Sequence, residues 1–305
     1  ENEKIKHRQY GAVSLIRSNI KEVDALATSM VEMATAIQAH EVKQQQLMDS
    51  FIKLIAQTID DKSPYTGGHC NRVPELGLML ADAAAECSSE PFKDFSFKSD
   101  DEYREFKIAA WLHDCGKIIT PEHIVDKGSK LETIYNRIHE IRMRFEVLWR
   151  DAEINYYQAL IKHPEQQEQL QQRLTEQQAK LSEEFAFVAN ANVGGEFMAD
   201  EKVQKLHQIA EQTWQRHFDD TLGLSPVEEM YVKAEKVSLP ATESLMTDKA
   251  EHIFQRDNNI DYEEKHGIKM PAPEHKANLG ELYNLSIARG TLTPEDRYII
   301  NEHII

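Results

Sequence analysis

The sequence predicts an all-α fold: a helical bundle with a long helical hairpin inserted into it and a coiled-coil helix before it. Hydrophobic residues make up 41% of the 305 positions, while glycine and proline number only 12 and 10, a composition that favours helices. Apolar residues also recur in steps of three and four over long stretches, which is the period of an amphipathic helix. The length allows a sizeable core and more than one domain.

The acidic charge limits the classes of partner. A formal net charge of -17 argues against nucleic acid and anionic membrane surfaces, because both repel an acidic protein. An anionic small molecule is still possible, since a bound metal cluster reverses the local field. Three cysteines without a CxxC pair favour a reducing compartment. No apolar run approaches the roughly 20 residues of a membrane span, and no signal peptide is present.

Residues 23–54 contain an apolar seam that alternates steps of three and four. This period predicts a coiled coil, and polar residues at its core positions would fix the register. Two explanations fit: a parallel homodimer through 23–54, or a long amphipathic helix packed within one chain. The dimer is favoured. The seam consists of Val23, Leu26, Met30, Met33, Ile37, His40, Gln44, Leu47, Phe51 and Leu54.

The stretch from Ser14 to Gln46, with IKEVDALATSMVEMATAIQ, resembles the second helix of a HAMP module that runs into a signalling helix. HAMP modules follow a transmembrane helix. The resemblance therefore implies a membrane sensor anchored upstream of Glu1, with this chain on the cytoplasmic side of the bacterial inner membrane. The first residue is not Met and Ile305 falls within a helical pattern, so we expect both ends to be cuts in a longer protein.

Helices are expected over about 70–87, 101–117 and 131–162. The segment DDKSPYTGGH (60–69) separates the first of these from the seam, because serine, proline and two glycines interrupt a helix.

Residues 133–275 are expected to form an inserted antiparallel helical hairpin. HPEQQEQLQQRLTEQQAKLSEEF predicts a long exposed helix, ANANVGGEF a turn, and DEKVQKLHQIAEQTWQRHF a returning helix. The flanking segments 126–141 and 288–304 are similar to each other. A duplication is one explanation, and insertion of the hairpin at a single loop–helix junction is the preferred one.

The strongest local signal is WLHDCGK, residues 111–117. His113 and Asp114 end an apolar run and lie about 100° apart on the predicted helix, so both can face one cleft. An imidazole and a carboxylate suit a divalent metal, and the carboxylate can bridge two ions. Lys117 lies on the same face as His113, where its ammonium can meet a phosphate oxygen.

Two further histidines are candidate ligands. His69 follows a pair of glycines at a helix start, with Arg72 three residues later. Taken alone, His69 is better explained as a surface or capping histidine, and the HD pair 44 residues downstream shifts the balance towards a ligand. His303 lies in the third turn of a helix that Thr293 caps. Because His303 lies beside apolar isoleucines, a histidine at the margin of a core is the better explanation when this residue is taken alone.

Three blocks together resemble the HD-GYP family of HD-superfamily metal-dependent phosphohydrolases. They are DDKSPYTGGHCNRV, AAWLHDCGKIITPEHIVDKGSKL and RGTLTPEDRYIINEH, in the order of the family. The resemblance covers about 60–132 and 276–305, and the hairpin accounts for the gap. It implies an HD-domain helical bundle, with the chain divided into a HAMP-like end and signalling helix (1–46), the first part of the HD-GYP domain (47–132), the helical hairpin insertion (133–275) and the domain's continuation (276–305).

The family hydrolyses the bacterial second messenger cyclic di-GMP with bound metal ions, usually iron or manganese. Two divalent ions are implied here, because Tyr65 stands where members with a third metal have a glutamate. Asp114 would be shared by both ions in a two-metal hydrolysis. By position, the resemblance implies His69, His113, Asp114 and His303 as metal ligands, Asp114 and Lys117 as catalytic residues, and Arg72 and Lys117 as substrate contacts.

The chain departs from the family at its end. A paired histidine, a Gly-Tyr-Pro loop and a final ligand aspartate are expected after His303, where only two residues follow. The predicted function is therefore a metal-dependent phosphodiesterase for cyclic di-GMP in bacterial sensory signalling, with an incomplete catalytic domain. The alternatives are a catalytically inactive signalling or dimerisation module, and an HD phosphohydrolase acting on another nucleotide.

Overall fold

The computed structural model describes residues 2–7, 9–62, 68–195, 197–232, 237–256 and 269–302. The chain forms two compact units, residues 1–115 and residues 116–305. The described part is mainly helical, which confirms the predicted fold class, and two small antiparallel sheets are its exception. No helix of this part is both long enough and apolar enough to cross a membrane.

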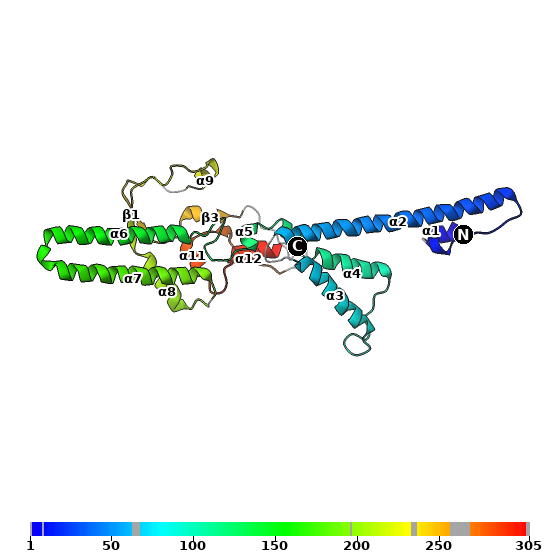
Figure 1. Cartoon of the computed structure of the whole chain (residues 1–305), viewed down its shortest axis with the longest axis horizontal. Coiled ribbons are helices and arrows are strands. Elements are labelled where there is room, and N and C mark those ends of the chain that lie inside the picture. Colours follow the sequence, from blue (N-terminus) through cyan, green and yellow to red (C-terminus); the bar gives the residue numbers. More distant parts are fainter. Residues whose placement is uncertain are drawn as a thin grey trace. The chain divides into compact units, whose positions relative to one another are not determined.

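The first unit is built around one long helix. Its elements are α1 (Asn2–Lys6), the 3-10 turn η1 (Tyr10–Ala12), α2 (Lys21–Lys62), α3 (His69–Glu86) and α4 (Asp100–Leu112) (Figure 1). The C-terminal part of α2 packs against both α3 and α4, and these two helices pack against each other. Ser99 begins α4 because its hydroxyl accepts a hydrogen bond from the backbone N–H of Glu102.

The continuity of α2 bears on the expected division of the chain. The boundary expected between residues 46 and 47 falls inside this helix, and the one expected between 132 and 133 falls inside the second unit. The four-part division derived from the family resemblance therefore stays a prediction.

The second unit begins with short elements and a long helical pair. These are the 3-10 turn η2 (Cys115–Ile118, whose first residue belongs to the first unit), α5 (Glu122–Val125), α6 (Ile138–Lys162), η3 (Pro164–Gln166), α7 (Gln167–Val193) and α8 (Asp200–Ala210). Strands and short helices follow: β1 (Thr213–Arg216), α9 (Pro226–Tyr231), β2 (Ala241–Ser244), η4 (Ala250–His252), β3 (Ile253–Gln255), β4 (His275–Asn278), α11 (Glu281–Leu285) and α12 (Pro294–Asn301).

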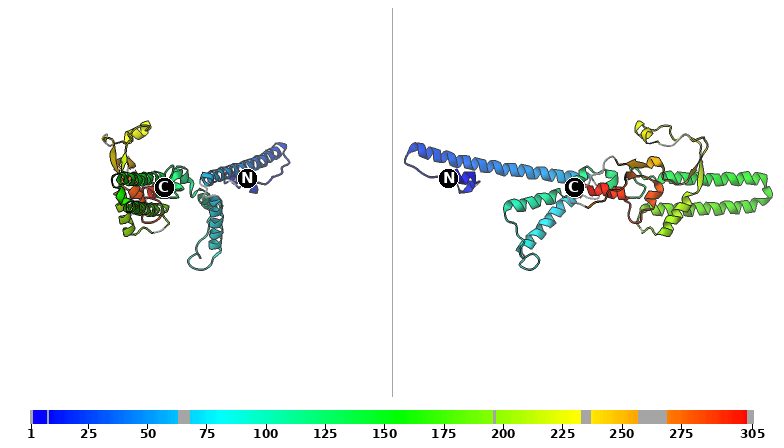
Figure 2. Two further views of the ribbon diagram at one scale, coloured as in Figure 1. Left: turned by 60° about the vertical axis from the view of Figure 1, so that its left-hand side comes forward. Right: turned by 180° about the vertical axis from the view of Figure 1, so that it is seen from behind.

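The helical hairpin differs from the expected one in its pairing. It consists of α6 and α7, which lie antiparallel along their length (Figure 2). Pro164 marks the turn, because the residue before a proline disfavours helical backbone. The expected returning helix over 200–218 is wrong in its second half, since α8 ends at Ala210 and residues 213–216 form β1.

The two sheets each contain two antiparallel strands. Trp214 of β1 stands opposite Glu243 of β2, and Phe254 of β3 stands opposite Ala277 of β4. None of these four strands was expected from the sequence, because strands of three or four residues are too short to display an alternating pattern.

The core of the second unit lies between the hairpin and the segments that follow it. Leu131, Ile141, Leu206 and Leu285 are fully buried there, and Phe145 packs edge-on against Phe185. These residues come from the loop before α6 and from α6, α7, α8 and α11. The hairpin is thus anchored at its base by residues far apart in the sequence.

Candidate metal centre

The site lies in the first unit, where the end of α2, the start of α3 and the end of α4 meet. Ala56, Ile59 and Cys70 form a small buried cluster there, and Trp111 of α4 packs against it. Trp111, which belongs to the apolar run before His113, therefore anchors the end of α4 beside α3.

Asp60 fixes the first turn of α3. Its side chain is buried with 3% of the residue exposed, and both carboxylate oxygens accept from the backbone N–H of Cys70, at 3.1 and 3.2 Å. The first N–H groups of a helix have no partner within the helix, and they carry the positive end of its dipole. A carboxylate there stabilises α3 and, with it, the position of the neighbouring His69.

Replacing Asp60 by asparagine is expected to loosen the start of α3. The amide side chain keeps the shape but loses the charge, which we expect to cost about 1 kcal/mol and to speed amide exchange in the first turn about fivefold. Hydrogen exchange measured by mass spectrometry reports this directly. Asp61→Asn is the matched control, because Asp61 is exposed and accepts a hydrogen bond from the side chain of Gln57 at 2.9 Å. Equal exchange in both variants would contradict the assigned role.

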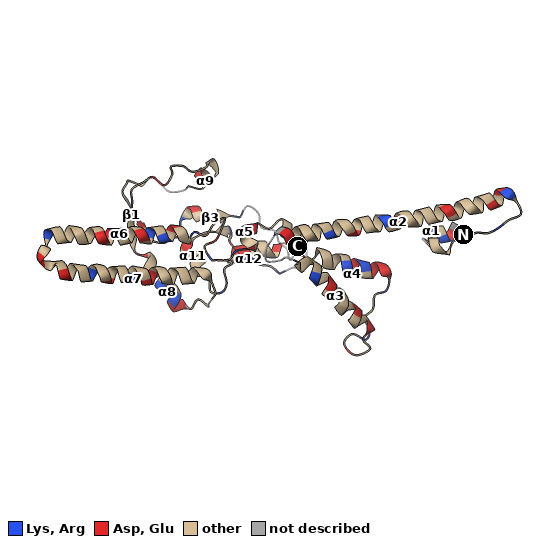
Figure 3. Ribbon diagram, in the orientation of Figure 1, with Lys and Arg blue, Asp and Glu red and all other residues tan. Residues whose placement is uncertain are grey.

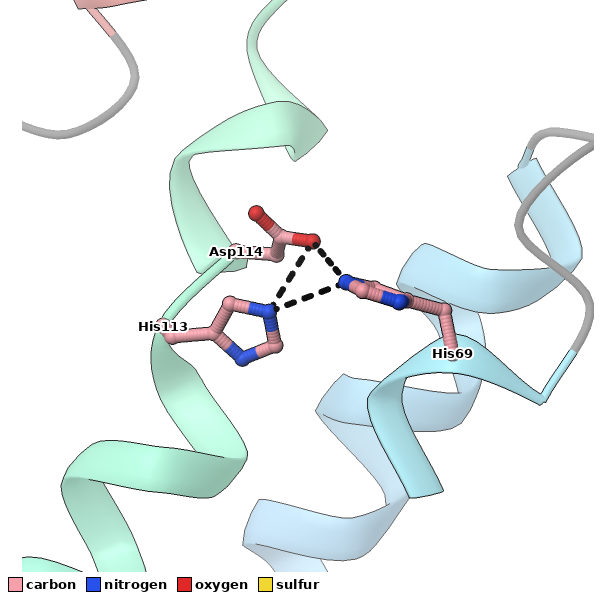
Figure 4. A group of neighbouring side chains, drawn as sticks. All are labelled: His69, His113 and Asp114. Carbon is pink, nitrogen blue, oxygen red and sulfur yellow. Dashed lines mark hydrogen bonds and ion pairs between the residues drawn. The ribbon is translucent and has the colours of Figure 1, made fainter. Parts of the chain in front are cut away.

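Three ligand-type atoms converge at this point (Figure 4). His69 is the first residue of α3, His113 follows the last residue of α4, and Asp114 comes next. The Nε2 atoms of the two histidines are 3.3 Å apart, and Oδ2 of Asp114 lies 3.4 Å from Nε2 of His69 and 3.2 Å from Nε2 of His113. The three atoms form a nearly equilateral triangle.

The orientation of His113 is fixed from its far side. Its Nδ1 lies 2.9 Å from the carbonyl oxygen of Ala110, so the Nδ1–H donates to that carbonyl. In the neutral ring this leaves the lone pair on Nε2, which faces the other two ligand atoms. Metal-binding histidines are commonly held in this way, because the second hydrogen bond sets both tautomer and ring direction.

The triangle has the size that a divalent cation requires. The centre of an equilateral triangle with sides of about 3.3 Å lies about 1.9 Å from each corner, so an ion slightly out of the plane would be about 2.1 Å from all three atoms, a normal length for bonds to imidazole and carboxylate. Two imidazoles and one carboxylate also match the ligand preferences of iron, manganese and zinc. The residues present therefore fit a metal ion.

The three side chains differ in their exposure to solvent. The side chain of Asp114 is 10% exposed, while those of His69 and His113 are 40% and 30% exposed. Asp114 is thus the most buried of the three ligands, and a carboxylate in this setting adds negative charge that favours a bound cation. A cation on the open side of the triangle would serve all three ligands and remain reachable from solvent.

The two cationic candidates, Arg72 and Lys117, lie in different elements of the chain. Arg72 is exposed on the first turn of α3, and its backbone N–H donates to the carbonyl of Gly68 at 3.1 Å. Lys117 belongs to η2 and to the second unit. The expected helix over 101–117 was too long, because α4 ends at Leu112 and Asp114 lies beyond it.

His303 and Tyr65 lie outside the residues that the structure describes. The placement of His303 as a fourth ligand, and the argument from Tyr65 against a third metal, therefore stay predictions.

Asp60 is a residue of the site that was not expected from the sequence. An acid in the last turn of a helix opposes the helix dipole, so something else must stabilise it. That signal was present in the segment that precedes the Ser-Pro break, since Asp60 and Asp61 both stand there. Only the structure distinguishes the buried member of this pair from the exposed one.

Comparisons with protein-family models, with curated proteins and with solved structures find no match to this chain. The resemblance to the HD-GYP family therefore rests on the three sequence blocks.

Proposed function

We propose that this chain carries part of the catalytic site of a metal-dependent phosphodiesterase that hydrolyses cyclic di-GMP in bacterial sensory signalling. The observation that supports it best is the convergence of His69, His113 and Asp114, with ligand atoms 3.2 to 3.4 Å apart. Two of these residues come from one HD-GYP-like block and the third from another, 44 positions upstream.

His69, His113 and Asp114 would hold one divalent ion, and the carboxylate of Asp114 is suited to being shared with a second. Iron or manganese is expected at both positions. Such ions, when bound, withdraw electrons from a phosphodiester and lower the pKa of coordinated water. Ala110 supports this role, because its carbonyl keeps the Nε2 lone pair of His113 directed at the site.

Cationic side chains of this chain would bind the substrate. We assign Lys117 and Arg72 to the phosphates of cyclic di-GMP, whose two negative charges an ammonium and a guanidinium can offset. His303 is the proposed fourth metal ligand. The HAMP-like pattern at 14–46 further supports a position on the cytoplasmic side of the bacterial inner membrane, beside a membrane anchor upstream.

Metal binding tests the ligand assignment. Titration of the metal-free protein with Mn²⁺, followed by electron paramagnetic resonance, is expected to show saturable binding, and His113→Ala is expected to weaken it at least about tenfold, since loss of one of three ligands costs more than loss of a supporting contact. His123→Ala is the control, because His123 is exposed on α5, away from the triangle in sequence and in the second unit. Unchanged binding in His113→Ala would refute the site.

Turnover tests the substrate. The Mn²⁺-loaded protein is incubated with cyclic di-GMP, other cyclic dinucleotides and nucleoside monophosphates, and the products are separated by chromatography. Hydrolysis of cyclic di-GMP that is lost in Asp114→Asn supports the proposal. Metal binding with turnover of another nucleotide would instead favour a different phosphohydrolase, and metal binding without turnover of any substrate would favour an inactive signalling module.

A further inference from the structure

The second unit contains a cavity of about 540 Å³. Sites for small molecules usually have a volume of roughly 300 to 1,000 Å³. The wall of the cavity is built by α8, the loop after β2, α11 and the segment from residue 286 to the first turn of α12. Its described lining includes none of the candidate metal ligands or substrate contacts named above. The cavity is therefore separate from the candidate metal centre in the residues that form it.

The cavity carries more positive than negative charge, although the chain as a whole is acidic. Arg289 and Arg297 line it, and Asp248 is the one acidic residue in its described lining. The whole chain has 35 lysines and arginines against 52 aspartates and glutamates, and the acidic residues occur along each of the long helices α2, α6 and α7 (Figure 3). A cavity whose charge is opposite to that of its protein is suited to an anion.

The two arginines of the cavity lack acidic partners in the described part of the chain, where neither Arg289 nor Arg297 forms an ion pair. Several other arginines do pair with a carboxylate, namely Arg104, Arg144, Arg150 and Arg216. A guanidinium is always protonated in a protein. Those of the cavity can therefore take an anion from solution without first breaking an ion pair.

The acidic residue of the cavity is bound to the start of α11. Oδ1 of Asp248 accepts a hydrogen bond at 3.1 Å from the backbone N–H of Tyr283, the third residue of α11. Gly280 makes room for this carboxylate, since a side chain at that position would overlap it. The first N–H groups of a helix have no partner within the helix and carry the positive end of its dipole. The charge of Asp248 is thus offset by the helix end rather than by the two arginines.

The guanidinium of Arg297 is held at the cavity by a single contact with the segment opposite. Its Nη2 donates to the carbonyl oxygen of Arg289 at 2.9 Å. A guanidinium has five N–H donors in a fixed planar arrangement. The contact with Arg289 uses one side of the group, so its other donors can bind an oxyanion.

The wall that carries Arg289 is fixed before any ligand binds. The ammonium of Lys130 donates to the carbonyl oxygens of Leu285 and Ile287 at 2.8 and 2.7 Å, and the backbone N–H of Met198 donates to the carbonyl oxygen of Ala288 at 2.9 Å. A site that is already ordered loses less conformational entropy when it binds a ligand.

The remaining wall is apolar, with one unsatisfied hydroxyl. Leu282, Ile287, Leu292 and Pro294 line this part of the cavity. The hydroxyl of Ser286, which belongs to the same lining, is buried and has no hydrogen-bond partner in the described residues. Such hydroxyls are rare in folded proteins. A rotation about its χ1 bond would allow Ser286 to donate to an oxygen atom of a ligand.

We propose that this cavity binds a small organic oxyanion, namely a carboxylate or a phosphate that carries an apolar body. A guanidinium binds either oxyanion through two parallel hydrogen bonds, a geometry that an ammonium does not offer. The apolar wall takes the body of the ligand, because small-molecule sites combine apolar contact area with a few fixed polar groups. An inorganic anion alone would fill only the arginine end of the cavity.

Calorimetric titration of the metal-free full chain tests the ligand class. The probes are phenyl phosphate and benzoate, with benzyl alcohol as the uncharged control of similar size. At least one of the two anions is expected to bind saturably at one site, and at least about tenfold more tightly than benzyl alcohol, since a hydrogen bond to a charged group contributes that much. The anion that binds more tightly identifies the head group. Failure of both anions to bind would refute the proposal.

Variants of the cavity locate the binding. Arg297→Gln is expected to weaken binding of the preferred anion about tenfold or more, and Arg297→Lys to weaken it too, because the charge remains but the planar fork is lost. Ala288→Trp keeps both arginines and fills the cavity, so it is expected to abolish binding; Ala288 is exposed and lines the cavity. Arg173→Gln is the matched control, because Arg173 is exposed on α7 and lies outside the lining. Circular dichroism checks that each variant is folded.

Two results would overturn the assignment of the cavity. One is unchanged binding in both Arg297→Gln and Ala288→Trp, and the other is an equal loss of binding in Arg173→Gln. His113→Ala, which removes a ligand of the metal triangle, is expected to leave anion binding unchanged. The titrations need neither metal nor turnover, so their outcome is separate from that of the proposed phosphodiesterase activity.

Discussion

Replacing Glu281 by alanine is expected to lower the free energy of unfolding of the second unit by about 3–5 kcal/mol, the usual cost of removing one partner from a buried ion pair. Glu281 is the first residue of α11 and is 1% exposed. Its two carboxylate oxygens accept from Nη1 of Arg144 at 3.0 and 2.8 Å, and the backbone N–H of Thr247 donates to one of them at 3.0 Å. The variant removes the buried carboxylate from the Arg144 guanidinium, which keeps the carbonyl of Leu245 at 3.0 Å, and it removes the acceptor of the Thr247 N–H.

Urea unfolding measures this effect in a Trp111→Phe background. Trp149 and Trp214, both in the second unit, then report its unfolding alone. Glu140→Ala is the matched control, because Glu140 also pairs with Arg144, at 3.5 Å, but its side chain is 42% exposed. Exposed pairs of this kind contribute at most about 1 kcal/mol. Similar losses of unfolding free energy in Glu281→Ala and Glu140→Ala would show that burial of the ion pair does not determine its contribution.

Lys130 is expected to make the second unit more stable as the pH rises from 8 to 10. It is 1% exposed, and its ammonium donates to two uncharged acceptors, the carbonyl oxygens of Leu285 and Ile287, at 2.8 and 2.7 Å. Burial lowers the pKa of Lys130 from 10.5 to about 8. Above pH 8 the unfolded chain therefore binds more protons than the folded one, and stability increases with pH.

The size of this gain follows from the shift of the pKa. Between the pKa of Lys130 in the folded chain and that in the unfolded chain, each pH unit adds at most about 1.4 kcal/mol to the free energy of unfolding. The free energy of unfolding therefore increases by about 2–3 kcal/mol between pH 8 and 10. Below pH 8 both states hold the proton and the cost of burial is constant. Burial raises the pKa of Tyr283, beside the carboxylate of Glu295, so that tyrosine ionises first in the unfolded chain and opposes the trend above about pH 10.

Urea unfolding in the Trp111→Phe background, repeated at several pH values, measures how the stability of the second unit depends on pH. Lys130→Met is expected to remove the rise in stability between pH 8 and 10, because the titrating group is gone. Lys205→Met keeps it, since Lys205 is exposed. A rise of equal size in Lys130→Met would assign the effect to another group.

The sequence predicted the helical class and the residues of the triangle, but not how they meet. His113 and Asp114 follow an apolar run, and His69 follows glycines, and each of these signals is local. Their convergence depends on the packing of α3 against α4 and on the contact of Asp60 with Cys70, which join segments 10 to 45 residues apart. Periodicity within a helix carries no information on such contacts.

The second unit was less predictable for a related reason. The expected hairpin placed its turn at ANANVGGEF, where Gly194 does end α7 with a positive φ of 72°. The partner of α7 is nevertheless α6, because Phe145 and Ile141 of α6 complete its apolar stripe. Two adjacent helices and a proline between them were visible in the sequence, whereas the choice between two possible partners was made by core packing.

The helix α2 is uninterrupted along its whole length. Its 42 residues include neither proline nor glycine, the residues at which helices most often bend. Because α2 has no such bend point, a rotation of its N-terminal end would be passed on towards Asp60 in its last turn. The carboxylate of Asp60 accepts a hydrogen bond from the N–H of Cys70. A rotation at the N-terminal end of α2 would therefore act on the backbone next to His69.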